Sequence, residues 1–334
     1  MSDWGDLVAR VRGLSTHLLG AGQLRAIAGS GGLAQLSAAI AQAGVIPAPL
    51  ERAGVRLLEQ GIRRHASRQL HLVWRWAGDR TSRLAPLVED EDRRSIRAML
   101  RGAASGTPPE ARLAGLVATP SLPERALLEL ARRGDVASVA SQLAAMGSPY
   151  ASAILEEASR QYPDLLRLEC ALNTRFAARA TAAAARAAAP MRAHVSSVLD
   201  VENCWTARLL PVNGSPVDVA DYFVEGGAEL SRDRWLAAAT APTVVAREAI
   251  LQQTAASPWL RAAAVGTARV EDAVLQATIA HQHGLARQDP LGTAPIIEYV
   301  LRLRAEVRAL QRMAWSVSLR VPAAAIAQAL EPVP

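Results

Sequence analysis

The chain has 334 residues, of which 50% are hydrophobic and only 4% are aromatic. Alanine, leucine, arginine and glutamate favour helices, and residues that favour strands are sparse, so the composition predicts an all-α protein. All 37 basic residues are arginine, which excludes the lysine of a phosphate-binding P-loop, a Schiff-base lysine and the kinase strand lysine.

The net charge is +6, because 31 acidic residues stand against the 37 arginines. The arginines are scattered among glutamate and aspartate, without the basic runs and interleaved aromatic residues of nucleic-acid binders. We therefore expect no nucleic-acid partner. The charge-free stretches 26–50 and 136–155 contain Pro, Gly, Ser and Gln, and we expect them to form buried helix pairs of a soluble chain rather than membrane spans.

A pair of short helices is predicted three times along the chain. Each copy has an apolar helix end, a four-residue turn built on Gly, Asp or Pro, and a second apolar helix. The copies cover 24–40, 127–143 and 235–251, and they align without gaps at offsets of 103 and 108 residues. Such self-similarity indicates an internal repeat.

Two further elements recur around these pairs. We call the first an arm helix, and its copies lie at 10–14, 92–96, 200–204 and 306–310. The second is a hydrophobic residue followed by glutamate at the start of a helix, as at positions 50–51, 168–169 and 270–271. The order of arm, helix pair and Glu helix runs three times and ends with a fourth arm. It predicts three helical lobes over 1–91, 92–199 and 200–334, arranged about a pseudo-threefold axis.

The last arm belongs to the longest amphipathic stretch, 295–319. Its apolar residues are spaced alternately three and four apart, which predicts one buried stripe along a helix. Pro295 fits the first helical turn, Pro322 fits a position just beyond the end, and Glu298 can pair with Arg302 one turn later.

The residues that could carry chemistry lack suitable spacing. His281 and His283 are two apart and would lie on different sides of a helix, so we expect no shared metal. Cys170 and Cys204 lack a nearby second cysteine and are expected to be ordinary thiols. The acidic residues 90–92 are expected at the start of an arm helix, where negative charge is favoured. We expect neither an enzyme nor a bound cofactor.

The arms resemble motifs of the C (AC39) family of V/A-type rotary ATPase subunits, whose eukaryotic member is the d subunit of the V-ATPase. The residues at 9–14, 92–102 and 200–208 are similar to that family's opening arm, its D-x-x-N-L…L-R-G pattern and the second occurrence of this pattern. Tyr299 and the residues from Glu298 to Leu310 are similar to its C-terminal signature. The chain departs from the motifs at Ser95, Ala309 and Gln311.

This resemblance implies a funnel-shaped helical socket with a central cavity. Such a non-catalytic rotor subunit would sit on the cytoplasmic mouth of the membrane proteolipid ring, receive the foot of the central shaft and couple the two during ATP-linked ion transport. Our candidates for the socket wall are Arg97, Arg101, Arg208 and Arg312. An alternative for each arginine is a salt bridge between neighbouring arms, and an alternative for the chain is a stand-alone helical scaffold.

Overall fold

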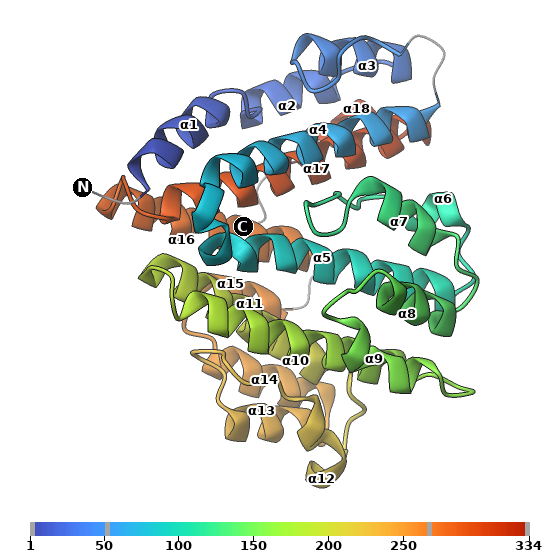
Figure 1. Cartoon of the computed structure of the whole chain (residues 1–334), viewed down its shortest axis with the longest axis vertical. Coiled ribbons are helices and arrows are strands. Elements are labelled where there is room, and N and C mark those ends of the chain that lie inside the picture. The colour runs from blue at the N-terminus through green and yellow to red at the C-terminus, as the bar shows by residue number, and fades with distance from the viewer. Residues whose placement is uncertain (1–3, 51–53, 266–268, 331–334) are drawn as a thin grey trace. The chain divides into compact units, whose positions relative to one another are not determined.

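The computed structural model describes residues 4–50, 54–265 and 269–330, and within these ranges all regular structure is helical (Figure 1). The predicted all-α class is therefore confirmed. In chain order the elements are α1 (Gly5–Ser15), α2 (Ala21–Ala28), α3 (Leu33–Gln42), α4 (Val55–Ala77), η1 (Gly78–Arg80), α5 (Thr81–Ala104), α6 (Pro109–Arg112), α7 (Glu124–Ala131), α8 (Val136–Ala145), α9 (Ala151–Ala158), α10 (Leu165–Ala184), α11 (Ala189–Leu209), α12 (Pro216–Val219), η2 (Ala220–Tyr222), α13 (Arg232–Ala239), α14 (Val244–Thr254), α15 (Pro258–Val265), α16 (Val270–Gln288), α17 (Ala294–Ser318) and α18 (Ala323–Ala329).

The chain divides into two compact units. Unit 1 comprises Met1–Gly78, Ala114–Pro120 and Gln282–Pro334, and unit 2 comprises Asp79–Leu113 and Ser121–His281. The three lobes expected from the repeat stay a prediction. Their two boundaries, at positions 91 and 199, fall inside the long helices α5 and α11.

The three predicted pairs of short helices are present as α2–α3, α7–α8 and α13–α14. The first helix of each pair has eight residues, and four residues separate it from the second. The second helix begins at a cap that differs between copies: Gly32, then Asp135 and Thr243, whose side chains accept a hydrogen bond from a backbone N–H in the first turn. The turn chemistry read from the sequence therefore places these helices correctly.

The first two copies also end alike. Gly44 follows α3 with φ +78°, and Gly147 follows α8 with φ +69°. In both, the N–H of the glycine and that of the next residue return to carbonyls of the last helical turn, which is the Schellman arrangement. A side chain at either glycine would be strained, so these two glycines fix where the helices stop.

Each of the last three arms packs on one pair of short helices. In unit 2, α5 packs on α7 and α8, while α11 packs on α13 and α14. In unit 1, α17 packs on α2 and α3, so the last arm of the chain contacts the first pair of short helices. The long partners follow a similar scheme, because α10 lies along α5 and α4 lies along α17 (Figure 1).

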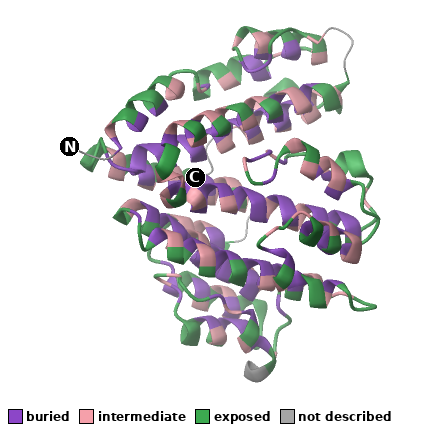
Figure 2. Cartoon of the chain, viewed as in Figure 1, coloured by how far each residue is buried: buried purple, intermediate pink, exposed green. Residues whose placement is uncertain are grey.

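The predicted apolar stripe of α17 is buried. Figure 2 shows that buried residues line the faces where helices meet. Pro295 lies in the first turn, and Glu298 lies 3.8 Å from Arg302. Only the last member of the stripe, Val317, is partly exposed. The buried members are Ile296, Val300, Leu303, Val307, Leu310 and Ala314.

An acidic residue in the arm holds the loop before the short pair. In α11, buried Asp200 accepts hydrogen bonds of 2.9 to 3.1 Å from three successive backbone N–H groups before α13, at residues 228–230. In α5, Asp92 at the matching repeat position accepts a 2.5 Å hydrogen bond from the hydroxyl of Ser121, which lies before α7. The Ser121 bond spans 29 residues, as does the bond from Glu229 to Asp200, so the two arms anchor their pairs alike.

Glu306 occupies the matching position of α17 and faces the loop before α2, but its environment differs. The side chain is 4% exposed, and the backbone amide of Leu19 approaches the carboxylate without meeting the geometry of a hydrogen bond. Burial raises the pKa of Glu306 to about 7, while the Leu19 amide and Arg302 act in the opposite direction.

We expect Glu306→Gln to stabilise the protein above neutral pH. Because the folded pKa of about 7 lies above the usual value of 4.5, the unfolded chain releases this proton first, and stability falls between these pH values. The glutamine variant lacks this loss and should gain about 3 kcal/mol above pH 8 and little below pH 4. Urea unfolding of both proteins between pH 4 and pH 8 measures this difference. If the free energy of unfolding of the two proteins changes with pH in the same way, the raised pKa of Glu306 is wrong.

Candidate functional site

A buried cluster of charged side chains lies in unit 2, where α5 presents a row of arginines to α10 and α11. Arg93, Arg97 and Arg101 are four residues apart and therefore share one face of α5. The Arg93 side chain is completely buried, Arg97 is 14% exposed and Arg101 is 54% exposed. The row thus runs from the core to the solvent.

Arg93 is neutralised inside the protein by groups from three helices. Its guanidinium lies 2.6 Å from Asp90 Oδ1 on α5 and 2.8 Å from Glu202 Oε1 on α11. It also donates to Asn173 Oδ1 on α10 at 2.6 Å, and it stacks over the Phe176 ring at 4.9 Å. A buried cation is tolerated when it is paired and hydrogen-bonded in this way.

Arg97 and Arg101 extend the network toward the surface. Arg97 lies 2.6 Å from Glu202 Oε2 and donates to Asn173 Oδ1 at 2.8 Å. Arg101 forms a two-bond pair with Glu169, at 2.5 and 2.6 Å. Burial alone would raise the pKa of Glu202, but Arg93 and Arg97 outweigh it and hold that pKa at about 2. Glu202 therefore stays ionised at neutral pH, and the network joins α5, α10 and α11.

Sequence reasoning singled out Arg97 and Arg101 but missed the groups that neutralise them. The predicted alternative for Arg97, a salt bridge between neighbouring arms, is present, because α5 and α11 are both arms. Arg93 directly follows Asp92 in one arm motif, and Glu202 lies two residues after Asp200 in the next. The arm motifs therefore already indicated where this network lies in the sequence. Glu169 is the fifth residue of α10, which begins at Leu165, so the hydrophobic-Glu pattern located the start of this helix only to within a turn.

The other two candidate arginines lie elsewhere. Arg208, also in unit 2, lies 3.1 Å from Glu248 and donates to the Ala263 carbonyl at 3.0 Å. Arg312 belongs to unit 1 and donates to the Ala329 carbonyl at 3.2 Å. The structure thus brings together Arg97 and Arg101 and gives Arg208 and Arg312 separate partners.

The expected helix start at Asp90, Glu91 and Asp92 is wrong. The helix α5 begins at Thr81, directly after η1, so these residues lie within it and all three are buried. Asp90 pairs with Arg93 and also accepts from Arg94 Nε at 3.0 Å. Asp90 therefore neutralises arginines of its own helix, and the acidic cluster does not mark a helix N-terminus.

Arg247 is a buried arginine that sequence reasoning also missed. It is 3% exposed, and its guanidinium donates to carbonyls at the ends of α11 and α13, those of Arg208, Leu210, Pro211, Ala238 and Ala239. In the two earlier copies of the repeat the same position holds Val139 and Leu36. An arginine at a position that is apolar in the other two copies was the sequence signal that could have identified Arg247.

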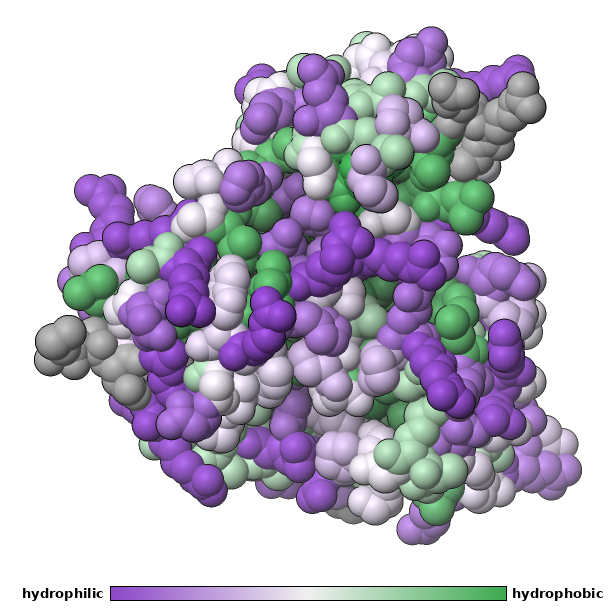
Figure 3. Space-filling model, turned by 45° about the horizontal axis from the view of Figure 1, so that its top comes forward, coloured by the Kyte–Doolittle hydropathy of each residue, from purple (hydrophilic) through white to green (hydrophobic). Residues whose placement is uncertain are grey.

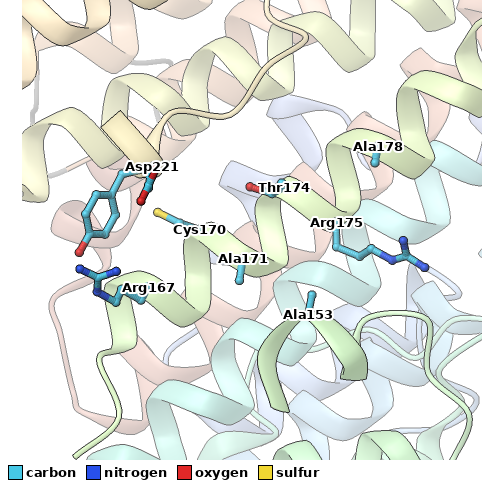
Figure 4. A pocket seen from close by; sticks show the side chains of 9 residues that line it. Ala153, Arg167, Cys170, Ala171, Thr174, Arg175, Ala178 and Asp221 are labelled. Atoms are coloured by element: carbon cyan, nitrogen blue, oxygen red, sulfur yellow. The ribbon is translucent and has the colours of Figure 1, made fainter. Parts of the chain in front are cut away.

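A groove of about 410 Å³ lies on the outer face of α10, between α9 and η2 (Figure 4). Its floor is made of small residues, and Arg167 and Arg175 lie along the same helix. Cys170 points into it, but burial raises the pKa of this thiol to about 12, so it stays protonated. The groove therefore offers no nucleophilic thiolate.

No potential metal site is found among residues 4–50, 54–265 and 269–330. His281 stacks on Trp259 and His283 contacts Glu298 at 3.0 Å, so the two rings have different surroundings. Both cysteines are free and buried. Within the same described ranges, no helix combines the length and apolar character needed to cross a membrane.

These features define a helical protein in which two arm helices, α5 and α11, are joined by a buried charge network. A family model described as ATP synthase (C/AC39) subunit matches residues 7–329, and the chain belongs to this family. Among curated proteins, the C subunit of the A-type ATP synthase of Haloquadratum walsbyi is 27% identical over 181 residues. That match spans 52% of this chain and 52% of the relative, about half of each.

Proposed function

We propose that the chain is a non-catalytic rotor subunit that couples the central shaft of a V/A-type ATPase or ATP synthase to its membrane proteolipid ring. The observation that carries this proposal is the family match over 7–329. In this role the protein binds no cofactor, small-molecule substrate or nucleic acid. It is peripheral to the membrane and reaches it through the ring on the cytoplasmic face.

The physical properties of the helices support a role in transmitting torque. Five of the helices have 20 or more residues, and α5, α10 and α11 are cross-linked by the charge network. Breaking one partner of a buried pair costs about 3–5 kcal/mol, so such helices resist being pulled apart. In the proposed socket, the three lobes surround a central cavity about a pseudo-threefold axis, and the shaft foot enters this cavity.

We place the shaft contacts of this socket at Arg97, Arg101, Arg208 and Arg312. Arg101 is the best of these candidates, because more than half of its side chain is exposed while Glu169 fixes its direction. Arg97 also holds α5 against α11.

Affinity capture from native membranes tests the proposed function. Tagged protein expressed in its own cells should retain the shaft subunits and the proteolipid ring after mild detergent extraction. A stand-alone scaffold would retain neither, and that result would overturn the proposal.

The arginine assignment is tested in the same capture. Arg101→Gln, Arg208→Gln and Arg312→Gln together should lower recovery of the shaft subunits by about tenfold or more while the ring is still retained. The matched control changes Arg125, Arg160 and Arg232 of unit 2, whose own side chains are each more than half exposed. Equal shaft recovery from both variants would discard the assignment.

A further inference from the structure

The charge of the chain is divided unequally between the two units. Unit 1 contains 15 arginines and 8 acidic residues, whereas unit 2 contains 22 arginines and 23 acidic residues. The net charges are therefore +7 and −1. The whole positive excess belongs to unit 1, which points to an anionic surface as its partner.

The outer face of α4 collects much of this excess. Arg64, Arg68, His71 and Arg75 follow one another at spacings of four, three and four residues, so they form one exposed row, and Arg56 continues it by two turns. We call this the α4 basic row; it is about 28 Å long. The opposite face of α4 is apolar and buried, with α17 packed along it.

Few acidic groups are available to neutralise this row. The one acidic residue of α4, Glu59, is 4% exposed and pairs with Arg63 at 2.9 Å. Within the described ranges, no carboxylate lies within salt-bridge distance of Arg56, Arg68 or Arg75. The row therefore keeps cations that face solvent.

Aromatic side chains lie at the end of the row. Trp74 and Trp76 flank Arg75 and are partly exposed, and Arg10 of α1 lies over the Trp76 ring at 5.6 Å. Tryptophan favours the headgroup level of a bilayer, where one edge of the ring is apolar and the other is wet.

The row lacks the apolar centre that a stable protein interface uses. Among the described residues of α4, one large hydrophobic side chain is exposed, that of Leu57 near the start of the helix. A stable protein interface has a larger apolar centre. Figure 3 shows one face of the molecule, on which hydrophilic and hydrophobic side chains are interspersed. Guanidinium groups recognise phosphate through two parallel hydrogen bonds, and phosphate would supply a negative charge to Arg56, Arg68 and Arg75.

We propose that the α4 basic row binds the phosphate headgroups of anionic phospholipids. The row, with Trp74 and Trp76 at its end, gives unit 1 a lipid contact separate from any contact with protein subunits. This inference rests on the proposed function, because it requires a chain held beside a membrane.

Flotation of the purified full chain with lipid vesicles tests the proposal. The protein should bind phosphatidylcholine vesicles that contain phosphatidylglycerol, should bind pure phosphatidylcholine much more weakly, and should lose binding as salt is raised. Arg68→Gln with Arg75→Gln should weaken binding to the anionic vesicles by about thirtyfold, because each cation near the surface contributes roughly a factor of five.

The matched control is Arg132→Gln with Arg234→Gln, two exposed arginines of unit 2. It makes the same change in net charge and should alter binding by about twofold or less. Equal losses from both pairs, or no preference for anionic vesicles, would overturn the proposal. If ring capture succeeds while vesicle binding fails, only the lipid contact is wrong; if ring capture fails, the proposed function is wrong.

Discussion

Glu202→Gln is expected to lower the free energy of unfolding by about 3–5 kcal/mol. The substitution keeps the shape of the side chain but leaves Arg93, which is completely buried, with one carboxylate in place of two. Arg97 loses a partner at 2.6 Å in the same step. Urea denaturation followed by circular dichroism measures the change.

Glu248→Gln is the matched control, because Glu248 also pairs with an arginine of an arm but is 34% exposed, and its partner Arg208 is 22% exposed. A pair that water reaches should contribute about 1 kcal/mol or less. If the two variants lose equal stability, the buried network does not hold the arms together.

Asp200→Ala is expected to cost about 3–5 kcal/mol. It removes the acceptor of three backbone N–H groups in the loop before α13 and leaves them buried or half-buried without a partner. Asp200→Asn keeps one acceptor oxygen and should lose less. Thermal and urea unfolding of both variants would show this order.

Asp233→Ala supplies the control, since this exposed residue in the first turn of α13 should change stability by about 0.5 kcal/mol or less. The loop also leaves no room for substitution at Gly227, where a Cβ would lie 2.1 Å from Asp200 Oδ1. If Asp200→Ala lowers stability no more than Asp233→Ala does, the loop before α13 is held by other contacts.

Local structure could be predicted because it depends on neighbouring residues. The turns before α8 and α14 contain their own capping side chains, and Gly44 and Gly147 carry the positive φ that stops two of the helices. The spacing of apolar residues likewise predicted which side of α17 is buried.

Contacts between distant segments could not be predicted in the same way. Nothing local to Arg93 distinguishes it from an exposed arginine, because its burial depends on α10 and α11. The same limit explains the error at residues 90–92, where the acidic cluster predicts a helix start although Asp90 pairs with Arg93 and Arg94 within the helix. The pairing of α17 with α2 and α3 joins the two ends of the chain and is also invisible to local patterns.

A density map of the assembly extracted from native membranes tests the proposed coupling most directly. We predict that the chain occupies the cytoplasmic mouth of the proteolipid ring, with the shaft foot inside the proposed central cavity. A map in which ring and shaft meet without this chain, or in which the chain lies away from both, would contradict the account.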